Sequence, residues 1–272
     1  STLCIVQFLE GPIEEEGMDK FSLADKTVLI TGASSGFGHH FAGVVADAGA
    51  NVVLGARRID KIEARVQELV AKGANVLGVP LDVNDPDSAA AFLGAAEAEF
   101  GTIDVLINNA GVEAGAKTYT MIDEEDWDYV LNTNLKSVWR LSKYYTEWAA
   151  KQGVSGNIIN VASITAYRTI KGQFPYAVSK AALVKATEIM ALEGARHGVR
   201  VNALAPGYIL TDVSRVLLES ERSETFVKGI PMRRYGEFDD LDGPLLLLAS
   251  DASSYMTGST IVVDGGHICS EL

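Results

Sequence analysis

Residues 27–38 read TVLITGASSGFG, an apolar run followed by a glycine-rich turn. The run Thr27–Thr31 is short and almost continuously apolar, as strands buried on both faces of a sheet are. Glycines allow the backbone to turn sharply into a helix, whose free amides and dipole favour a bound phosphate. The spacing Gly-x-x-x-Gly-x-Gly differs from the usual Gly-x-Gly-x-x-Gly, so a tight turn that binds nothing is the alternative. The predicted phosphate-binding residues are Gly32, Ser34, Ser35, Gly36, Phe37 and Gly38.

Apolar runs and amphipathic segments alternate along the rest of the chain. Further strands are expected at Asn51–Gly55, Asn75–Val79, Val105–Asn108, Asn157–Val161, Arg200–Leu204 and Thr260–Asp264. Helices, with apolar residues three and four apart, are expected at Gly38–Gly49, Lys61–Lys72, Ser88–Phe100, Glu124–Lys151, Tyr176–Arg196 and Asp240–Ala249. This alternation predicts an α/β fold: a single doubly wound Rossmann-type domain with a parallel sheet of about seven strands and helices on both faces.

The first residues differ from the rest of the chain. Ser1–Phe8 is apolar but short, and the acidic stretch after it ends at Gly17, just before Met18. We expect residues 1–17 to be a flexible N-terminal extension and residues 18–272 to form the single domain. Deleting the extension is expected to leave activity intact.

Composition excludes several classes of protein. The chain has 23 Lys and Arg against 36 Asp and Glu, a net charge of −13, whereas a nucleic-acid binder needs a basic face. Its two cysteines, Cys4 and Cys269, cannot form the disulfide framework of a small secreted domain. No apolar run approaches the ~20 residues that span a bilayer. We therefore expect a cytoplasmic protein with no nucleic-acid or membrane partner.

The end of the second predicted strand indicates which dinucleotide binds. An acid at this place would accept a hydrogen bond from the adenosine ribose 2′-hydroxyl. The sequence has Arg57 and Arg58 instead, and guanidinium groups bind phosphates through parallel hydrogen bonds. The arginines thus favour NADP, with NADPH preferred over NADH. The alternative is an arginine pair that only solvates a helix start, where the helix dipole disfavours cations.

Tyr176 and Lys180 lie four residues apart at the start of a predicted helix, so their side chains share one face. A free phenol has a pKa of about 10, and a nearby ammonium favours the phenolate. We therefore expect Lys180 to lower the pKa of Tyr176. By itself a Tyr-x-x-x-Lys pattern is common on solvated helix faces. Whether the pair is catalytic therefore has to be judged from the motifs around it.

With these surroundings the chain resembles the short-chain dehydrogenase/reductase family from Asp19 to about His267. The motifs that carry the resemblance occur in the family's order. They are Thr31–Gly38, Leu81–Val83, Asn108–Gly111, Asn134, Ser163, Tyr176 with Lys180, Pro206–Gly207 and Asp264–Gly266. The resemblance implies an NAD(P)-dependent interconversion of alcohol and carbonyl groups.

The resemblance also implies four catalytic residues. Ser163 would hydrogen-bond the substrate oxygen, and Tyr176 would be the general acid/base. Lys180 would hold the nicotinamide ribose and act on Tyr176. Asn134 would bend its helix and hold a water that links Lys180 to solvent. The alternative interpretation is an asparagine on the helix surface, although asparagine is unfavourable in the middle of a helix.

Cofactor contacts implied by the resemblance follow the third, fourth and sixth predicted strands. Asp82 and Val83 would touch the adenine, and Asn108 with Gly111 would support the cofactor from the fourth strand, where a turn that only stabilises the sheet is the alternative. Thr211 would bind the carboxamide. The complete set beyond the phosphate turn is Arg57, Arg58, Asp82, Val83, Asn109, Ala110, Gly111, Tyr176, Lys180, Pro206, Gly207, Ile209 and Thr211.

Other features bear on the assembly and on metals. Three tryptophans lie on Glu124–Lys151, which with Tyr176–Arg196 resembles the helix pair that packs between subunits of the family, so a homotetramer or homodimer is implied. His39, His40, His197 and His267 have no carboxylate at metal-ligand spacing, and no catalytic metal is expected.

We therefore predict an NADP(H)-dependent oxidoreductase that interconverts a ketone and a secondary alcohol on a small molecule. A β-ketoacyl thioester reductase is one alternative; it would need a basic patch for an acidic carrier protein, with Arg168, Lys171, Arg233 and Arg234 as candidates. A non-catalytic dinucleotide-sensing regulator is the other. Polar residues of the substrate loops, Glu113, Lys171 and Gln173, are able to meet hydroxyl or carboxylate groups.

Overall fold

The computed structural model describes residues 20–210 and 223–270, and the proposed extension 1–17 lies outside them. Seven strands form one parallel sheet in the order β3-β2-β1-β4-β5-β6-β7. Their bounds are β1 Thr27–Thr31, β2 Asn51–Ala56, β3 Val76–Pro80, β4 Val105–Asn108, β5 Gly156–Val161, β6 Val199–Pro206 and β7 Thr260–Val263. The predicted fold class is confirmed.

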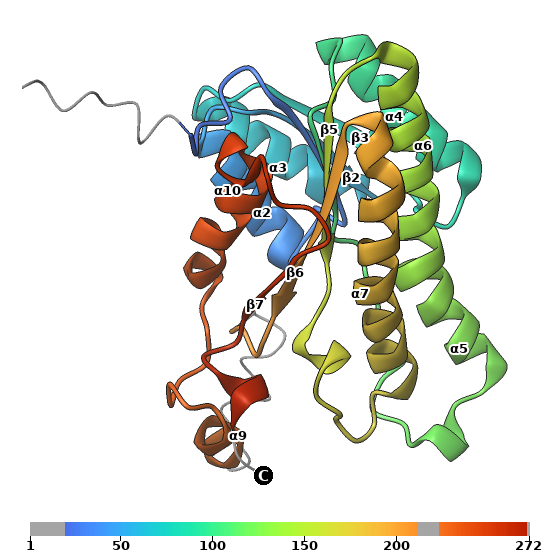
Figure 1. Cartoon of the computed structure of the whole chain (residues 1–272), viewed down its shortest axis with the longest axis vertical. Coiled ribbons are helices and arrows are strands. Elements are labelled where there is room, and N and C mark those ends of the chain that lie inside the picture. The colour runs from blue at the N-terminus through green and yellow to red at the C-terminus, as the bar shows by residue number, and fades with distance from the viewer. Residues whose placement is uncertain (1–19, 211–222, 271–272) are drawn as a thin grey trace, which may run out of the picture.

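Helices cover both faces of the sheet (Figure 1). Helices α2, α3 and α10 lie on one side, and α4, α6 and α7 on the other. The α-helices are α2 Gly36–Asp47, α3 Ile59–Ala71, α4 Pro86–Phe100, α5 Glu124–Leu131, α6 Ser137–Gln152, α7 Phe174–Gly194, α9 Ser223–Gly229 and α10 Asp242–Ala249. None of the described helices is long and apolar enough to cross a membrane.

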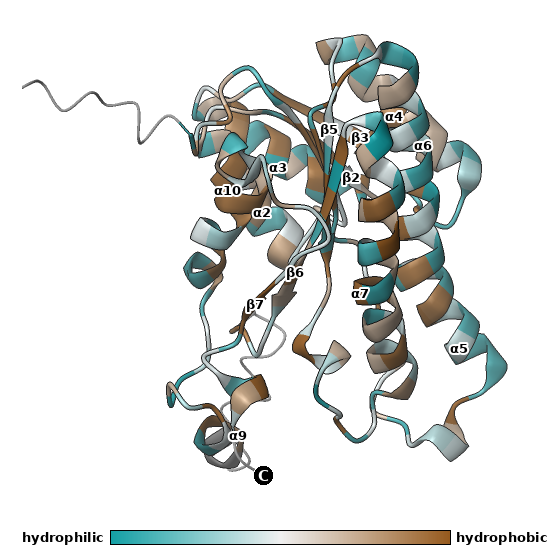
Figure 2. Ribbon diagram, in the orientation of Figure 1, coloured by the Kyte–Doolittle hydropathy of each residue, from teal (hydrophilic) through white to brown (hydrophobic). Residues whose placement is uncertain are grey.

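Two apolar layers hold the sheet between the helices. On one face Phe41 of α2 and Leu245 of α10 pack against Ile30 of β1. On the other face Phe92 of α4 and Tyr145 of α6 are fully buried against the sheet. The central strands are largely hydrophobic, whereas the helices alternate hydrophobic and hydrophilic turns (Figure 2). This pattern is the one expected of strands buried on both faces and helices with one apolar side.

The order of the strands in the sheet indicates where a ligand binds. The order reverses between β1 and β4, which pair with Ile30 opposite Ile107, while Thr31 of β1 stands opposite Gly55 of β2. In open α/β sheets the ligand binds at the carboxyl ends of the strands beside this reversal. The turns after β1, β2, β3 and β4 therefore meet at one edge of the sheet.

One predicted helix differs from the structure. The segment expected as a single helix over Glu124–Lys151 forms α5 and α6, joined by a π-helical turn at Asn132–Lys136. Turns of this kind inside α-helices are frequent at functional sites. The irregularity falls on Asn134, where the sequence predicts a bend.

Candidate active site

The phosphate turn has the backbone that its glycines predict. Gly32 and Gly36 adopt φ of 67° and 57°, in the region that glycine favours. A Cβ on Gly32 would lie 2.8 Å from the Cα of Ala110, so a larger residue would push the turns after β1 and β4 apart. Ser35 precedes α2 without capping it through its side chain, so the amides at the start of that helix face outward for an anion.

Both predicted arginines belong to the same cavity as this turn. The cavity has a volume of about 330 Å³, and Arg57 and Arg58 line it. Arg58 Nη2 donates to Ser34 Oγ at 2.8 Å and to Ser35 Oγ at 2.7 Å. Arg57 is exposed. The phosphate turn thus carries two guanidinium groups on its open side, within a chain that is acidic overall.

The turns after β3 and β4 complete the cavity. Asp82 and Val83 line it, as do Asn109, Ala110 and Gly111. The Asn109 side chain donates to the carbonyl of Thr31 at 2.8 Å, and the amides of Asn109 and Ala110 donate to Thr31 Oγ1, each at 3.0 Å. These bonds lock the end of β4 to the end of β1.

Asn108 has a different place from its neighbour. Its side chain is buried and donates to Asn160 Oδ1 at 2.9 Å and to Ser142 Oγ at 3.1 Å. It does not line the cavity, which fits the alternative of a turn that stabilises the sheet. Its amide joins β4 to β5 and α6, and it stabilises the sheet.

Ser163, Tyr176 and Lys180 come together beyond the end of β5. Ser163 stands two residues after β5 and hydrogen-bonds the Tyr176 hydroxyl, while Tyr176 and Lys180 lie on the first turns of α7. Lys180 is 4% exposed, and its Nζ donates to the carbonyl of Val161 at 2.7 Å. This Nζ lies 5.6 Å from the centroid of the Tyr176 ring.

Burial dominates the electrostatics of this group. It raises the pKa of Tyr176 to about 12, which the hydrogen bond with Ser163 counteracts, and it lowers the pKa of Lys180 to about 8. The prediction that Lys180 lowers the pKa of Tyr176 is therefore wrong for this structure. Lys180 lies against the ring with its ammonium on a backbone carbonyl, and desolvation outweighs any attraction to the phenolate.

Asn134 connects the π-helical turn to this group. It is fully buried, its Oδ1 accepts from the amide of Val112 at 2.8 Å, and its Nδ2 donates to the carbonyl of Val112 at 3.0 Å. Nδ2 also donates to Ser179 Oγ at 3.1 Å, and Ser179 donates to the carbonyl of Tyr176. The alternative of a surface asparagine is excluded, because Asn134 ties the loop after β4 to the first turns of α7.

Residues after β6 pack against the end of β7 and do not line the cavity that holds Arg57 and Arg58. Pro206 ends β6, and the amide of Gly207 donates to the carbonyl of Val263 at 2.8 Å. Ile209 is buried. A Cβ on Gly207 would lie 2.7 Å from the Cα of Asp264, so glycine is required where these backbones meet. Thr211 lies outside the described residues.

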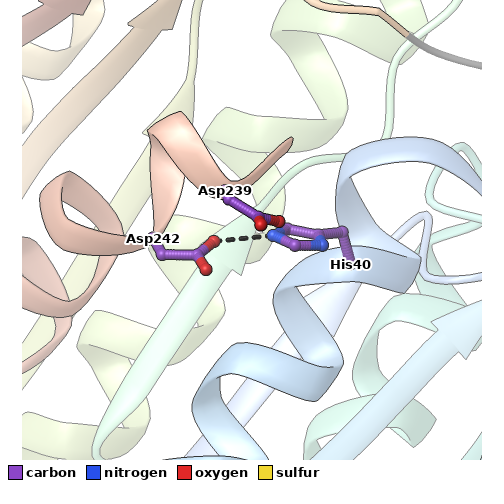
Figure 3. A group of neighbouring side chains, drawn as sticks. All are labelled: His40, Asp239 and Asp242. Carbon is purple, nitrogen blue, oxygen red and sulfur yellow. Dashed lines mark hydrogen bonds and ion pairs between the residues drawn. The ribbon is translucent and has the colours of Figure 1, made fainter. Parts of the chain in front are cut away.

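Three potential metal ligands from distant parts of the sequence lie close together in the structure. His40, Asp239 and Asp242 offer ligand atoms within 4.8 Å of one another (Figure 3). His40 Nε2 and Asp242 Oδ1 are 2.6 Å apart, a hydrogen-bond distance, and the His40 ring stacks on Phe238 at 5.1 Å. The pair joins α2 to α10, on elements other than those that carry Tyr176.

Comparison with known proteins places this geometry in context. The model of a family described as enoyl-(acyl carrier protein) reductase matches residues 32–267. The 2-dehydro-3-deoxy-D-gluconate 5-dehydrogenase of Dickeya dadantii is 38% identical, over 92% of this chain and 98% of the relative. The 3-oxoacyl-[acyl-carrier-protein] reductase of Thermotoga maritima is also 38% identical, over 90% and 99%. A crystal structure of gluconate 5-dehydrogenase from Burkholderia cenocepacia, in complex with NADP and tartrate, has a TM-score of 0.88 at 31% identity and covers 94% of this chain and all of that one.

Proposed function

The chain belongs to the short-chain dehydrogenase/reductase family, and on that premise we propose that Tyr176 is the general acid/base of its reaction, with Ser163 and Lys180 as its partners. The enzyme is an oxidoreductase that acts on CH–OH groups and interconverts a ketone and a secondary alcohol on a small molecule. The observation that carries the assignment is the convergence of Ser163, Tyr176 and Lys180 at the carboxyl edge of the sheet.

The residues around the cavity fit NADP(H). The phosphate turn offers helix amides, and Arg57 and Arg58 offer donors for a phosphate on the adenosine ribose. When bound, the reduced cofactor would supply the hydride. Asp82, Val83 and the turn Asn109–Gly111 would hold its adenosine half, and Pro206, Gly207, Ile209 and Thr211 its nicotinamide half. We propose a preference for NADPH over NADH on the strength of the two arginines.

The chain's own groups suggest how the proton moves. In reduction Ser163 would donate a hydrogen bond to the carbonyl oxygen, and Tyr176 would give its proton to the alkoxide that forms there. A phenol with a pKa of about 12 is protonated at neutral pH, as an acid must be. Lys180, with a pKa of about 8, is able to exchange protons in the neutral range, and Asn134 holds the start of α7 in place. At neutral pH Tyr176 is therefore in the protonated form that reduction requires.

A β-ketoacyl thioester reductase is the second candidate, because the Thermotoga maritima relative bears that activity in its name. Three of the four basic residues that would receive an acidic carrier protein already bond protein groups, namely Arg168, Arg233 and Arg234. Arg234 is paired with Asp240 at 2.6 and 2.8 Å, and Arg168 Nη1 donates to the carbonyl of His267 at 2.6 Å. A free hydroxylated ketone, of the kind named for the Dickeya dadantii relative, is therefore the better candidate.

A dinucleotide sensor without turnover would not need Ser163, Tyr176 and Lys180 in one place. The test is turnover with NADPH and with NADH, measured side by side on keto-sugar acids, cyclic ketones and β-ketoacyl thioesters. Reduction of a ketone with NADPH supports the proposal. Tight NADPH binding with no reduction of any member would overturn it in favour of the sensor.

Assembly is a further proposal. We propose that α6 and α7 pack against a second copy in a homotetramer or homodimer. The support is that Trp139, Ile189 and Leu192 are 52%, 50% and 81% exposed on these helices, whereas Trp148 packs against the core. Light scattering of Leu192→Glu should then show a smaller particle than the unmodified chain, and an unchanged mass would contradict the interface.

A further inference from the structure

A second cavity, of about 230 Å³, has the two residues after Ser163 in its wall. Ile164 and Thr165 line it, as does Tyr208, which stands two residues after the end of β6. The amide of Thr165 donates to Ser163 Oγ at 3.1 Å, and the amide of Arg168 donates to the carbonyl of Ile164 at 2.9 Å. These bonds fix the wall of the cavity to the residue that would bind the substrate oxygen.

Arg168 also lines this cavity and uses only part of its guanidinium within the protein. Its Nη1 donates to the carbonyl of His267 at 2.6 Å and to Ser270 Oγ. Its Nε and Nη2 bond no group among residues 20–210 and 223–270. The bonds of Nη1 hold the guanidinium in place, and the edge formed by Nε and Nη2 keeps the parallel N–H donors that bind a carboxylate.

Two buried polar atoms in the same wall have no partner in the described part of the chain. They are His267 Nδ1 and Thr165 Oγ1, and both residues line the cavity. His267 as a whole is 7% exposed. Buried polar atoms are nearly always hydrogen-bonded, because leaving one without a partner costs its desolvation. Two such atoms in one small cavity, beside a partly free guanidinium, indicate a ligand that bonds all three.

The turn that carries His267 is held firmly. The carboxylate of Asp264 accepts from two backbone amides of this turn, at 2.8 and 2.7 Å, and the amide of His267 donates to the carbonyl of Asp264 at 3.2 Å. The His267 ring lies 5.5 Å from the ring of Tyr208. The imidazole therefore has a fixed position in the wall, and the charge of the nearby Asp264 is compensated by amides.

Positive charge outweighs negative charge at this wall. Burial is the largest effect on the two rings: it raises the pKa of Tyr208 and lowers that of His267, and Arg168 lowers both pKa values. Glu113 opposes Arg168 at Tyr208 but acts more weakly, and Asp264 does the same at His267. His267 is thus neutral at neutral pH and offers an N–H without a charge. One guanidinium with neutral donors suits a carboxylate, whereas a phosphate dianion is typically met by a cluster of arginines.

We propose that this cavity is a carboxylate-binding subsite for the substrate. Arg168 binds the acid group through Nε and Nη2, and Thr165 Oγ1 and His267 Nδ1 donate to it. The carbonyl of the same molecule then lies at Ser163 and Tyr176. The inference rests on the proposed function and names its substrate class as keto acids. A cavity of this size admits an acid group and a few carbons, but not the face of a carrier protein.

The experiment compares keto acids with their amides, which have nearly the same shape without the charge. The probes are 3-oxobutanoate, 4-oxopentanoate, 5-oxohexanoate and the keto-sugar acids, each against its amide, with NADPH as the reductant. The unmodified chain should reduce the best acid with a kcat/KM roughly ten-fold or more above that of its amide. Equal values for acids and amides, or reduction of neutral ketones alone, would overturn the inference.

Arg168→Gln should lower kcat/KM for the best acid by roughly 10- to 100-fold, the usual effect of losing a hydrogen bond to a charged group. The value for the matching amide should stay within about three-fold. Arg168→Lys keeps the charge without the planar fork and should give an intermediate loss on the acid. Because Arg168 also bonds the carbonyl of His267, a merely structural role would lower the values for acid and amide together, and that result would overturn the inference.

Thr165→Val tests one of the unbonded atoms separately. It removes the hydroxyl and keeps the shape of the side chain, so kcat/KM for the acid should fall by roughly 3- to 10-fold while the value for the amide changes less. The Tm should stay the same or rise, because the hydroxyl has no hydrogen bond in the described chain to lose. A lower Tm with an unchanged preference for the acid would contradict the role of Thr165.

Controls separate this inference from the proposed function. Lys151→Gln removes the same charge from the last turn of α6, where the side chain is exposed, and should leave both kinetic values unchanged. The Kd for NADPH should be the same in the Arg168 variants, which shows that the fold and the cofactor site are intact. If the unmodified chain reduces no ketone at all, the proposed function fails, whereas turnover without a preference for the acid fails only the inference.

Discussion

The two ends of the cofactor site, the phosphate end and the reacting end, differ in how far their positive charges are exposed to solvent. At the phosphate end Arg57 and Arg58 are exposed, and the donors of Arg58 rest on the hydroxyls of Ser34 and Ser35. At the reacting end Lys180 is 4% exposed and is held by a backbone carbonyl. Charge in the open attracts a ligand and is screened by salt, whereas charge in the interior shifts pKa values and is not screened.

This difference separates binding from chemistry in the molecule. The phosphate end supplies many donors, each replaceable in part by its neighbours or by water. At the reacting end the proposed mechanism depends on a single phenol, that of Tyr176, for its proton transfer. Substitutions at the two ends should therefore differ in kind: graded losses of affinity at one, and loss of turnover at the other.

Tyr176→Phe is the sharpest test of that separation. It removes only the hydroxyl that gives the proton, so kcat should fall by roughly 10³-fold or more, since proton transfer and the bond to the developing oxyanion are lost together. The Kd for NADPH should stay within about two-fold, because the phenylalanine ring fills the same space. Single-turnover reduction and cofactor fluorescence measure the two quantities. Activity within ten-fold of the unmodified chain would contradict the assigned acid.

At the phosphate end we expect a graded effect. Arg57→Ala and Arg58→Ala should each weaken NADPH binding by about 1.5–3 kcal/mol, which is roughly 10- to 150-fold, and should change NADH binding much less. Binding of NADPH to the unmodified chain should also weaken as salt rises, because both guanidiniums are exposed. Titrations with both cofactors at two salt concentrations provide the measurement. Equal losses of affinity for NADPH and NADH would mean that the arginines do not bind the ribose phosphate.

The backbone of the phosphate turn could be predicted from the sequence, although Gly36, Phe37 and Gly38 do not line the cavity, and the reacting end could be predicted only in part. The turn Gly32–Gly38 and its strand are contiguous, so local spacing carries their geometry. Ser163, Tyr176 and Lys180 were expected together, but the bond from Lys180 to the carbonyl of Val161 was not, because any strand end offers such a carbonyl. The direction of the Tyr176 pKa shift is predicted wrongly. Sequence spacing indicates which residues are neighbours, but it does not show how deeply the phenol is buried. His40 and Asp242 are 202 residues apart, beyond any motif.

The pH dependence of the reverse reaction tests the interior electrostatics. Alcohol oxidation needs the phenolate of Tyr176, whose pKa is about 12, so its rate should still be rising with pH at the alkaline end of the stable range. The negative charge of Glu113 disfavours the phenolate, and Glu113→Gln should therefore lower this pKa and move the profile toward lower pH. As a control, Glu99→Gln changes an exposed carboxylate on α4, and its profile should match that of the unmodified chain. A shift toward higher pH in Glu113→Gln would show that the carboxylate does not act on Tyr176.

The smallest effect is expected behind the phosphate end, where α2 meets α10. His40→Ala removes the bond to Asp242 and the stacking on Phe238, both partly exposed, so the free energy of unfolding should fall by only about 1 kcal/mol. Because α2 carries the amides of the phosphate turn, a looser α2 should weaken NADPH binding slightly and leave the Tyr176 pH profile where it was. Urea unfolding of His40→Ala and Asp242→Asn, with and without EDTA, gives the stability. Equal stability of the unmodified chain with and without EDTA would identify a hydrogen-bonded pair. A loss of its stability in EDTA would mean instead that His40, Asp239 and Asp242 hold a metal ion.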